Sequence, residues 1–411
     1  MEFFYSLLVL LVVTRVCGEL AERLGQPALL GELISGILLG LFVVHQFPSA
    51  IPAVANGETS EVFIALTDLG VFFLMLYAGV EMDPGELVAD YQTSLAVALG
   101  GTLVPFGLGF GLGWLVLPSS ELQLAQAFFL GAALAITAIP VAVKVLMDLE
   151  LLHTEPGQLI VSAAIIDDVI GLVLLAVLTA LIETGATPSP GAFAWLLLKI
   201  SLFFLGAWLV AGWVLPLLAA WSRPLLEEEQ EFSVLVIVAL GFSLFAEFFG
   251  LHFILGAFTA GAFYTPAAVG ETTYEDILHK TDAITFGFLA PLFFVSIGLH
   301  LDVGALTEVP VFVLGLVGIG ILGKLAGAGL PVLLSGGSVR EAGMVGVGMS
   351  ARGAVEVVIA DIALRAGLFS EPSPTPAVVE HLFSAVVIMA VVTTLFAPLG
   401  LRLVRASEGS A

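Results

Sequence analysis

Two adjacent carboxylates, Asp167 and Asp168, stand near the middle of an apolar run from Gln158 to about Ile182. A run of this length is a candidate membrane-spanning helix. One ionisable side chain at the bilayer centre costs roughly 2.5–3.5 kcal/mol on the insertion scale, and two cost about double. A chain carries that cost where something interacts with the charge. The default interpretation of the pair is therefore an ion or proton site inside a membrane protein.

The composition agrees with a membrane location. The chain has 411 residues, of which 59% are hydrophobic and 11% are charged, whereas soluble domains carry about 25% charged residues. The start, MEFFYSLLVLLVV, has no basic region and no cleavage site, so it is expected to be the first span and not a signal peptide. A single cysteine, Cys17, excludes a disulfide framework. A net charge of −23 disfavours nucleic acid and anionic lipid surfaces as partners.

Hydropathy predicts about thirteen spans with short connections and no soluble domain. They are placed near 3–24, 27–44, 61–81, 92–117, 122–147, 158–183, 191–221, 231–249, 251–266, 283–301, 308–334, 339–367 and 377–403. We therefore expect an all-α polytopic membrane protein.

Basic residues predict the orientation. With the N-terminus outside, nearly all loop Lys and Arg side chains fall at cytoplasmic ends, and only Arg365 lies near an outer end. The cytoplasmic set is Arg23, Lys144, Arg223, Lys280, Arg340, Arg402 and Arg405. We expect a multi-pass protein of the cell (inner) membrane with the N-terminus outside and the C-terminus in the cytoplasm.

An internal repeat links two distant helix pairs. Residues 21–36 (AERLGQPALLGELISG) and 246–261 (AEFFGLHFILGAFTAG) share the pattern A-E-x-x-G-x5-G-x4-G. The copies lie an odd number of spans apart, so they cross the membrane in opposite directions, as in the inverted-topology repeats of many secondary transporters. Chance agreement of small residues in glycine-rich helices is the alternative. The repeat pairs the first six spans with the last six and leaves 191–221 as a linker.

Two spans at corresponding positions of the repeat carry helix-breaking signals. The span 122–147 contains ALAITAIPVAV, with Thr137 and Pro140 near its middle. Proline removes a backbone donor, and carbonyls freed in this way can coordinate a cation, although a simple kink is the alternative. The span 339–367 contains MVGVGMSARGAVEVVIADIA, in which glycines weaken the helix around Arg352. We expect two discontinuous crossing helices.

Two further charges lie at the same depth. Arg352 and Glu356 are spaced i,i+4, which favours a structural intrahelical pair over contact with substrate. Arg352 can also supply fixed positive charge that holds the crossed helices together.

Lys324, in the span 308–334, needs a partner unless it snorkels to the interface. Neighbours on a helix project about 100° apart, so one aspartate of the pair can bind Lys324 while the other faces a water-filled cavity. Unpaired, these charges would cost on the order of 10 kcal/mol. They are expected to meet in one site.

Other polar residues give weaker signals. Asp68, Glu22, Glu32 and Glu247 are expected near span ends, and the histidines are expected at loops or surfaces: His45, His153, His252, His279, His300 and His381. No Cys/His metal cluster, phosphate-binding loop or nucleophile–base signature is found. The sequence therefore predicts neither an enzyme nor a cofactor.

One stretch of the chain resembles the signature of the monovalent cation:proton antiporter-2 family, which includes bacterial sodium/proton antiporters and plant cation/proton exchangers. This stretch reads TAIPVAVKVLMDLELLHTEPGQLIVSAAIIDDVIGLVLL. Three further segments also look like those of the family: PLFFVSIGLHLD, GKLAG and MSARGAVEVVIADIAL. The resemblance covers essentially the whole chain, and its most specific part is the aspartate pair after the Thr-x-x-Pro helix.

The resemblance implies a homodimer. Its dimerisation domain would comprise 1–81 and 231–301, its core ion-transport domain 92–183 and 308–403, and its linker helix 191–221. Asp168 would bind Na+ and the proton, Asp167 would pair with Lys324, and Thr137 would lie at the helix crossing. An Asp-Asp pair goes with electrogenic exchange in the family. No nucleotide-binding regulatory domain is found in the chain, which counts against the potassium-efflux branch.

The expected activity is exchange of Na+ or Li+ for H+ by alternating access, with the transported ions and membrane lipid as the small-molecule partners. A K+/H+ antiporter of the same family is the nearest alternative, because nothing in the residue types separates the two cations. A sodium-coupled symporter of an organic anion and a channel are more distant alternatives.

Overall fold

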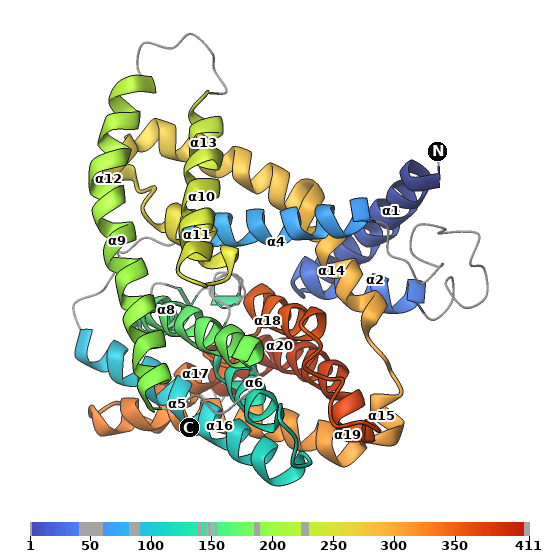
Figure 1. Cartoon of the computed structure of the whole chain (residues 1–411). Coiled ribbons are helices and arrows are strands. Elements are labelled where there is room, and N and C mark those ends of the chain that lie inside the picture. The colour runs from blue at the N-terminus through green and yellow to red at the C-terminus, as the bar shows by residue number, and fades with distance from the viewer. Residues whose placement is uncertain are drawn as a thin grey trace. The chain divides into compact units, whose positions relative to one another are not determined.

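The structure is a computed structural model that describes residues 2–40, 61–81, 91–137, 154–184, 190–222 and 230–406, with isolated positions between 142 and 152. These residues form helices, and no strand occurs among them (Figure 1). Eight helices in the described ranges are long and apolar enough to cross a membrane, and shorter apolar helices accompany them. The all-α polytopic fold is confirmed. Positions 45, 140, 144, 153 and 223, which carried sequence predictions, lie outside the described residues.

The chain forms two compact units: unit 1 is Met1–Pro84 with Ser189–His300, and unit 2 is Gly85–Pro188 with Leu301–Ala411. In unit 1 the helices are α1 (Glu2–Arg23), α2 (Ala28–Leu38), α4 (Glu61–Glu81), α9 (Pro190–Ser222), α10 (Gln230–Phe248), α11 (Phe253–Ala262), α12 (Pro266–Val269), α13 (Glu271–Ile284), the π-helical segment η4 (Thr285–Leu289) and α14 (Ala290–His300). The stretch from α13 to α14 is continuous, so the predicted span 283–301 started too late. Its polar first part, ETTYEDILHKTD, conceals the helix from a hydropathy window.

The repeat seen in the sequence is also a repeat of backbone conformation. Gly25 after α1 and Gly250 after α10 both have positive φ, 71° and 69°. In each turn the next residue's N–H returns to the carbonyl of the repeat's alanine, at 2.9 Å in the first copy and 3.0 Å in the second. Glycine suits both positions because it adopts the left-handed conformation without steric cost.

The close helix contacts of the repeat correspond as well. A Cβ on Gly31 of α2 would lie 2.1 Å from the Cys17 carbonyl oxygen of α1, and a Cβ on Gly256 of α11 would lie 2.2 Å from the Phe242 carbonyl oxygen of α10. The same offset in the sequence relates both glycines and both carbonyls. Chance agreement is therefore excluded, and the repeat is one of structure as well as of sequence; that its copies cross the membrane in opposite directions stays a prediction.

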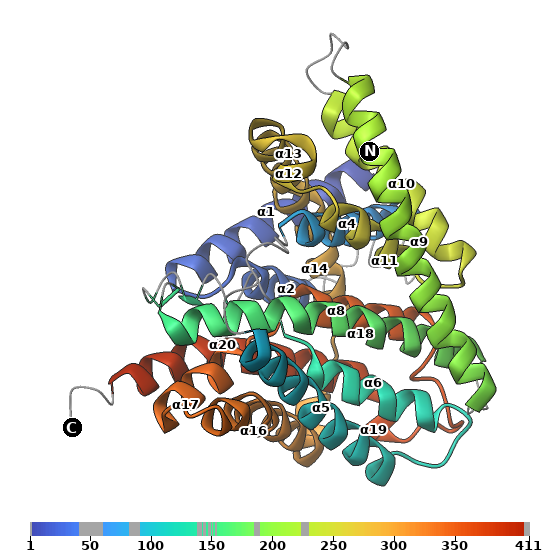
Figure 2. The same cartoon turned by 90° about the vertical axis from the view of Figure 1, so that its left-hand side faces the viewer.

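Unit 2 contains the aspartate pair. Its helices are α5 (Tyr91–Val116), α6 (Gln123–Ala135), α8 (Glu155–Thr184), α15 (Ala305–Glu308), α16 (Pro310–Leu334), α17 (Val339–Gly348), α18 (Ala354–Arg365), α19 (Ala377–Glu380) and α20 (Leu382–Ala406). Helices α5 and α16 lie side by side in both views (Figures 1 and 2). Gly100 and Gly327 permit this approach, since a Cβ on either would lie within 2.3 Å of the other's carbonyl oxygen.

Two helices of unit 2 are interrupted. Helix α6 ends at Ala135 and continues into extended backbone at Ile136, where ψ is 140°. Helix α17 ends at Gly348, and α18 begins only at Ala354. The two discontinuous helices predicted from the sequence are therefore present.

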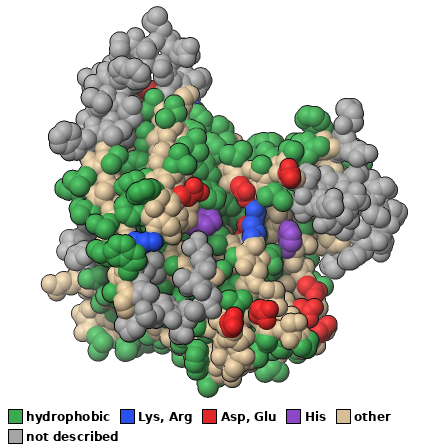
Figure 3. Space-filling view, in the orientation of Figure 1, with side chains coloured by type: hydrophobic (Ala, Val, Ile, Leu, Met, Phe, Trp, Pro, Cys, Tyr) green, Lys and Arg blue, Asp and Glu red, His purple; other side chains and the backbone are tan. Residues whose placement is uncertain are grey.

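The surface carries much apolar area. Along α1, large apolar side chains recur every fourth residue and are more than half exposed: Phe4, Leu8, Val12, Val16 and Leu20. Figure 3 shows one face on which hydrophobic side chains are widespread and charged ones are few. Such a surface suits lipid contact, because hydrocarbon does not penalise exposed apolar groups.

Candidate functional site

Asp167 of α8 lies at the centre of a buried polar cluster in unit 2. Its side chain is 0% exposed. One carboxylate oxygen, Oδ1, accepts a hydrogen bond from the Thr102 hydroxyl of α5. The other, Oδ2, accepts the backbone N–H of Thr137 at 2.9 Å and lies 3.4 Å from Lys324 Nζ. The carboxylate is therefore held from three directions by two polar donors and one cation.

Lys324 of α16 contacts the break in α6 more closely than it contacts the carboxylate. Its ammonium donates to Thr137 Oγ1 at 2.7 Å, and its side chain is 0% exposed. The Thr137 hydroxyl in turn donates to the Met349 carbonyl, at 3.1 Å, where α17 ends. Thr137 thus links both breaks to the Asp167–Lys324 pair. The alternative, that Lys324 snorkels to an interface, is excluded because the side chain is buried.

Arg352 lies between α17 and α18 and binds the end of α6. One Nη donates to the carbonyls of Ala133 and Ile136, the latter at 3.1 Å, and the other donates to the Leu134 carbonyl at 2.6 Å. The last carbonyls of a helix have no partner within the helix. A buried guanidinium at this end also complements the partial negative charge of the helix terminus.

This geometry agrees with two interpretations of the sequence. Arg352 and Glu356 form the buried i,i+4 ion pair expected from their spacing, although their Nε–Oε2 distance of 3.8 Å is longer than a hydrogen bond. Arg352 also joins the crossed helices through α6, which was the second interpretation.

Glu356 is 1% exposed, and neither of its carboxylate oxygens accepts a hydrogen bond from the part of the chain that the structure describes. It lies in the first turn of α18, where a negative charge suits the helix end. Its charge also offsets those of Arg352 and Lys324. Burial without hydrogen bonds is costly unless neighbouring cations compensate it.

Asp168 differs from its neighbour in accessibility. Asp167 is 1% exposed, whereas Asp168 is half-buried. This difference is expected for adjacent helical residues that project about 100° apart. Asp168 is thus the carboxylate of the pair that solvent and ions reach more easily. Around this site the donors are carboxylate, hydroxyl and carbonyl oxygens, which suit a hard cation.

Thr102 and Thr394 were missed by sequence reasoning. The Thr394 hydroxyl of α20 donates to the Arg352 carbonyl at 3.0 Å, within the interruption between α17 and α18. Each is a threonine in an apolar span, a weak signal because such hydroxyls often bond to their own helix. The Thr102 hydroxyl also lies 2.8 Å from the Ala98 carbonyl of its own helix, as this rule expects.

Two other expectations are wrong. Glu32 is 4% exposed in the middle of α2, where its Oε1 lies 4.0 Å from Arg15 Nη1 of α1. His381 lies at the expected place, between α19 and α20, but it is 2% exposed and not at the surface. In contrast, Glu22, Glu247 and His279 are exposed as predicted.

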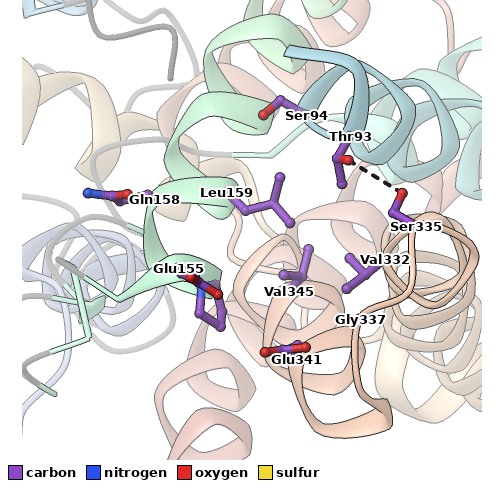
Figure 4. Close-up of a pocket in the computed structure, with 11 residues that line it drawn as sticks. Thr93, Ser94, Glu155, Gln158, Leu159, Val332, Ser335, Gly337, Glu341 and Val345 are labelled. Carbon is purple, nitrogen blue, oxygen red and sulfur yellow. Dashed lines mark hydrogen bonds between the residues drawn. The ribbon is translucent and has the colours of Figure 1, made fainter. Parts of the chain in front are cut away.

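A separate hollow of about 400 Å³ lies in unit 2 among the starts of α5, α8 and α17 and the end of α16 (Figure 4). Its lining includes Glu155, Glu341 and the hydroxyls of Thr93 and Ser335, whose oxygens are 3.4 Å apart. None of the cluster residues lines it. The buried cluster, not this hollow, is therefore the candidate site.

Comparisons with known proteins agree with the fold described above. The chain is 33% identical over 399 residues to the Na+/H+–K+ antiporter GerN of Bacillus cereus, covering 97% of this chain and 95% of GerN. It is 30% identical over 405 residues to a Na+/H+ antiporter of Enterococcus hirae, covering 98% of both chains. The solved sodium proton antiporter MjNhaP1 of Methanocaldococcus jannaschii has the same fold, with a TM-score of 0.71 at 18% identity over 100% of this chain and 98% of that one. The model of the family described as sodium/hydrogen exchanger, transmembrane, matches residues 7–405, and the chain belongs to that family.

Proposed function

We propose that this protein is a secondary active transporter that exchanges Na+ or Li+ for H+ across the membrane by alternating access. The observation that carries the proposal is the charged cluster at the crossing of two interrupted helices. Such breaks form the substrate site in many secondary transporters, because backbone carbonyls and helix ends face the bound ion. The names of the relatives, which are Na+/H+ antiporters, support the same cation.

Within this proposal Asp168 binds the transported cation and, alternately, the proton. Its half-buried position supports the assignment, since a carrier carboxylate must be accessible and yet partly desolvated. Sodium is the cargo and is not a resident cofactor; no cofactor is part of the proposed cycle. A bound cation displaces the proton, and Lys324 then exchanges partners around Asp167.

Thr137 positions the cation site through the break in α6, and Arg352 and Glu356 compensate charge at the crossing. The aspartate pair supports electrogenic exchange, with more than one proton moved per sodium ion. The second proton is carried within the Asp167–Lys324 pair, whose Oδ2–Nζ distance of 3.4 Å leaves the ammonium bonded chiefly to Thr137.

The two compact units support a division of labour. Unit 2, with the cluster, is the core ion-transport domain, and unit 1 is the dimerisation domain of a homodimer; α9 belongs to unit 1 and connects the two in the chain. The protein resides in the cell (inner) membrane with its N-terminus outside and its C-terminus in the cytoplasm. Cysteine accessibility at the two ends of the chain tests this orientation.

Proton flux in proteoliposomes tests the activity. A pH gradient is imposed, and Na+, Li+ or K+ is added to wild type and to Asp168→Asn. The proposal expects a response to Na+ and Li+ that the variant loses. A variant that still exchanges at the wild-type rate would show that Asp168 is not the carrier. No cation response in wild type would refute antiport and favour a sodium-coupled symporter.

Potassium exchange is the second candidate, because the name of GerN includes K+. The same assay separates the two activities. A response to K+ alone would retain the fold and the site but assign the protein to K+/H+ exchange.

A further inference from the structure

The hollow in unit 2 and the buried cluster around Asp167 are built from the same helices, α5, α8, α16 and α17. Each helix lines the hollow near one end, and the same helix, or the residue directly after it, supplies a group of the cluster further along. The pairs of residues, hollow first, are Ser94 and Thr102, Leu159 and Asp167, Val332 and Lys324, and Val345 and Met349. At a rise of about 1.5 Å per residue, the hollow lies roughly 12 Å or less from the cluster along the helix axes.

A layer of small apolar residues lies between the hollow and the cluster. Ala98, Ala163 and Ala328 each stand midway between the two members of a pair, and each is 0% exposed. Gly101 of α5 belongs to the same layer, since a Cβ there would lie 3.4 Å from Ala328 Cβ and 3.8 Å from the end of the Met349 side chain. Methionine is unbranched and flexible. The largest side chain of the layer is therefore also the one that moves most easily.

A buried hydroxyl at the depth of this layer lacks a protein partner. Ser162 directly precedes Ala163 in α8 and is 1% exposed, and its Oγ makes no hydrogen bond within the part of the chain that the structure describes. Ser162 follows Glu155 by seven residues, so it shares a face of α8 with a residue that lines the hollow. Buried polar groups without protein partners are usually bonded to water. The hydroxyl therefore points to water between the hollow and the cluster.

The lining of the hollow suits water and a positive charge. Its polar side chains include three hydroxyls and two carboxylates, those of Thr93, Ser94, Ser335, Glu155 and Glu341 (Figure 4). No lysine or arginine is among the described residues that line it. A volume of about 400 Å³ holds several water molecules, since one occupies about 30 Å³ in the liquid. The four helices of the hollow hold Asp167, whereas its neighbour Asp168 projects about 100° away on α8.

We propose that the hollow is a water site through which the Asp167–Lys324 pair releases its proton to the cytoplasm, separately from the route of the cation to Asp168. The inference rests on the proposed function, in which this pair carries the second proton, and on the proposed orientation, in which the hollow opens to the cytoplasm. Rotation of the Met349 side chain admits water across the alanine layer. One N–H bond of Lys324 then breaks and an O–H bond forms on the adjacent water. The neutral amine stays beside Asp167, and the hydronium ion leaves through the hollow.

Filling the hollow tests this route. Leu159→Trp places a larger side chain in the hollow, where Figure 4 shows Leu159 directed toward the middle, and Leu330→Trp, at an exposed position of α16, is the matched control. Sodium-driven proton flux is compared in proteoliposomes with the exchange of radioactive for unlabelled sodium, which moves no net proton. Leu159→Trp should slow the proton flux at least several-fold and leave sodium–sodium exchange unchanged, and Leu330→Trp should change neither. Wild-type proton flux in Leu159→Trp, or an equal loss of both fluxes, would overturn the route.

Thiol labelling measures access of water without transport. Cys17, the single cysteine of the chain, is replaced by alanine, and Ser162→Cys is labelled in the purified protein with a small water-soluble thiol reagent. Labelling should be fast, and it should slow several-fold when Leu159→Trp is added but not when Leu330→Trp is added. Ser243→Cys, at another buried hydroxyl without a partner in the described residues, lies in α10 of unit 1 and should be labelled slowly throughout. This result would support the water site even if wild type exchanged no sodium, in which case the proposed function alone would fail. Labelling of Ser162→Cys that is as slow as that of Ser243→Cys, or that Leu159→Trp does not slow, would overturn the site.

Discussion

Substitutions of Arg352 can distinguish the contribution of its hydrogen bonds to the end of α6 from that of its ion pair with Glu356. Methionine at this position removes the donors to three carbonyls of α6 and leaves Glu356 buried without its nearest cation. Each hydrogen bond from a charged donor contributes about 1.5–3 kcal/mol, and breaking a buried ion pair from one side costs about 3–5 kcal/mol. We expect Arg352→Met to lower the free energy of unfolding by about 4 kcal/mol or more, and Arg352→Lys, which keeps the charge, by less.

The partner substitution Glu356→Gln should have a much smaller effect. At 3.8 Å and an effective dielectric constant near 20, the Coulomb attraction is about 4 kcal/mol. Neutral glutamine also removes the desolvation cost of a buried carboxylate, which is of similar size. The net change should be about 1 kcal/mol. In the double variant Arg352→Met/Glu356→Gln the uncompensated charge is gone, but the carbonyls of α6 remain without donors. The double variant should therefore be more stable than Arg352→Met and yet remain less stable than wild type by more than about 2 kcal/mol.

Unfolding of the four proteins in one detergent, followed by tryptophan fluorescence, measures these differences as a double-mutant cycle. Sodium-driven proton flux is recorded in parallel. Recovery of the double variant to within about 1 kcal/mol of wild type would refute the reasoning. It would show that Arg352 serves mainly to neutralise Glu356, as the i,i+4 spacing first suggested.

Two further predictions concern single hydroxyl groups. Thr102→Val removes a donor to the buried Asp167 carboxylate and should slow sodium-driven proton flux at least several-fold, whereas Thr102→Ser keeps the hydroxyl and should remain close to wild type; equal flux in Thr102→Val and wild type would contradict a role for this bond. Ser338→Ala removes the cap that accepts Glu341 N–H at 3.2 Å at the start of α17, so it should lower stability by about 1 kcal/mol in thermal unfolding without changing the cation response. A lost cation response would mean that the α17 terminus affects the site directly.

The sequence predicted the helices because they depend on local composition. A span boundary failed where a polar segment continues a helix, as in α13. The pairing of Lys324 with one aspartate followed from the cost of isolated charges in a membrane. Spacing alone did not show that Asp167, and not Asp168, contacts Lys324, because this depends on the rotation of α8 about its axis.

Long-range contacts to carbonyl groups were beyond sequence reasoning. Arg352 binds three carbonyls that any residue could supply, so nothing in the side chains of α6 indicates the contact. The burial of His381 was missed for a similar reason: the carboxylates near it lie about 75 residues away, and a histidine at a helix start is usually solvated. Backbone acceptors and partners distant in the sequence become visible only when the chain is folded.

Within the proposed function, the fixed charges at the crossing leave Asp168 as the exchangeable carboxylate. Arg352 is committed to the C-terminal end of α6, and Glu356 lies at the N-terminal end of α18, so each charge complements the helix end it contacts. Lys324 is committed to Thr137 and Asp167. The charges that compensate the two helix breaks therefore belong to fixed side chains and not to the transported ions. In the proposed cycle, the half-buried Asp168 is then the group whose charge a transported ion neutralises, and sodium and the proton compete for it because either one does so.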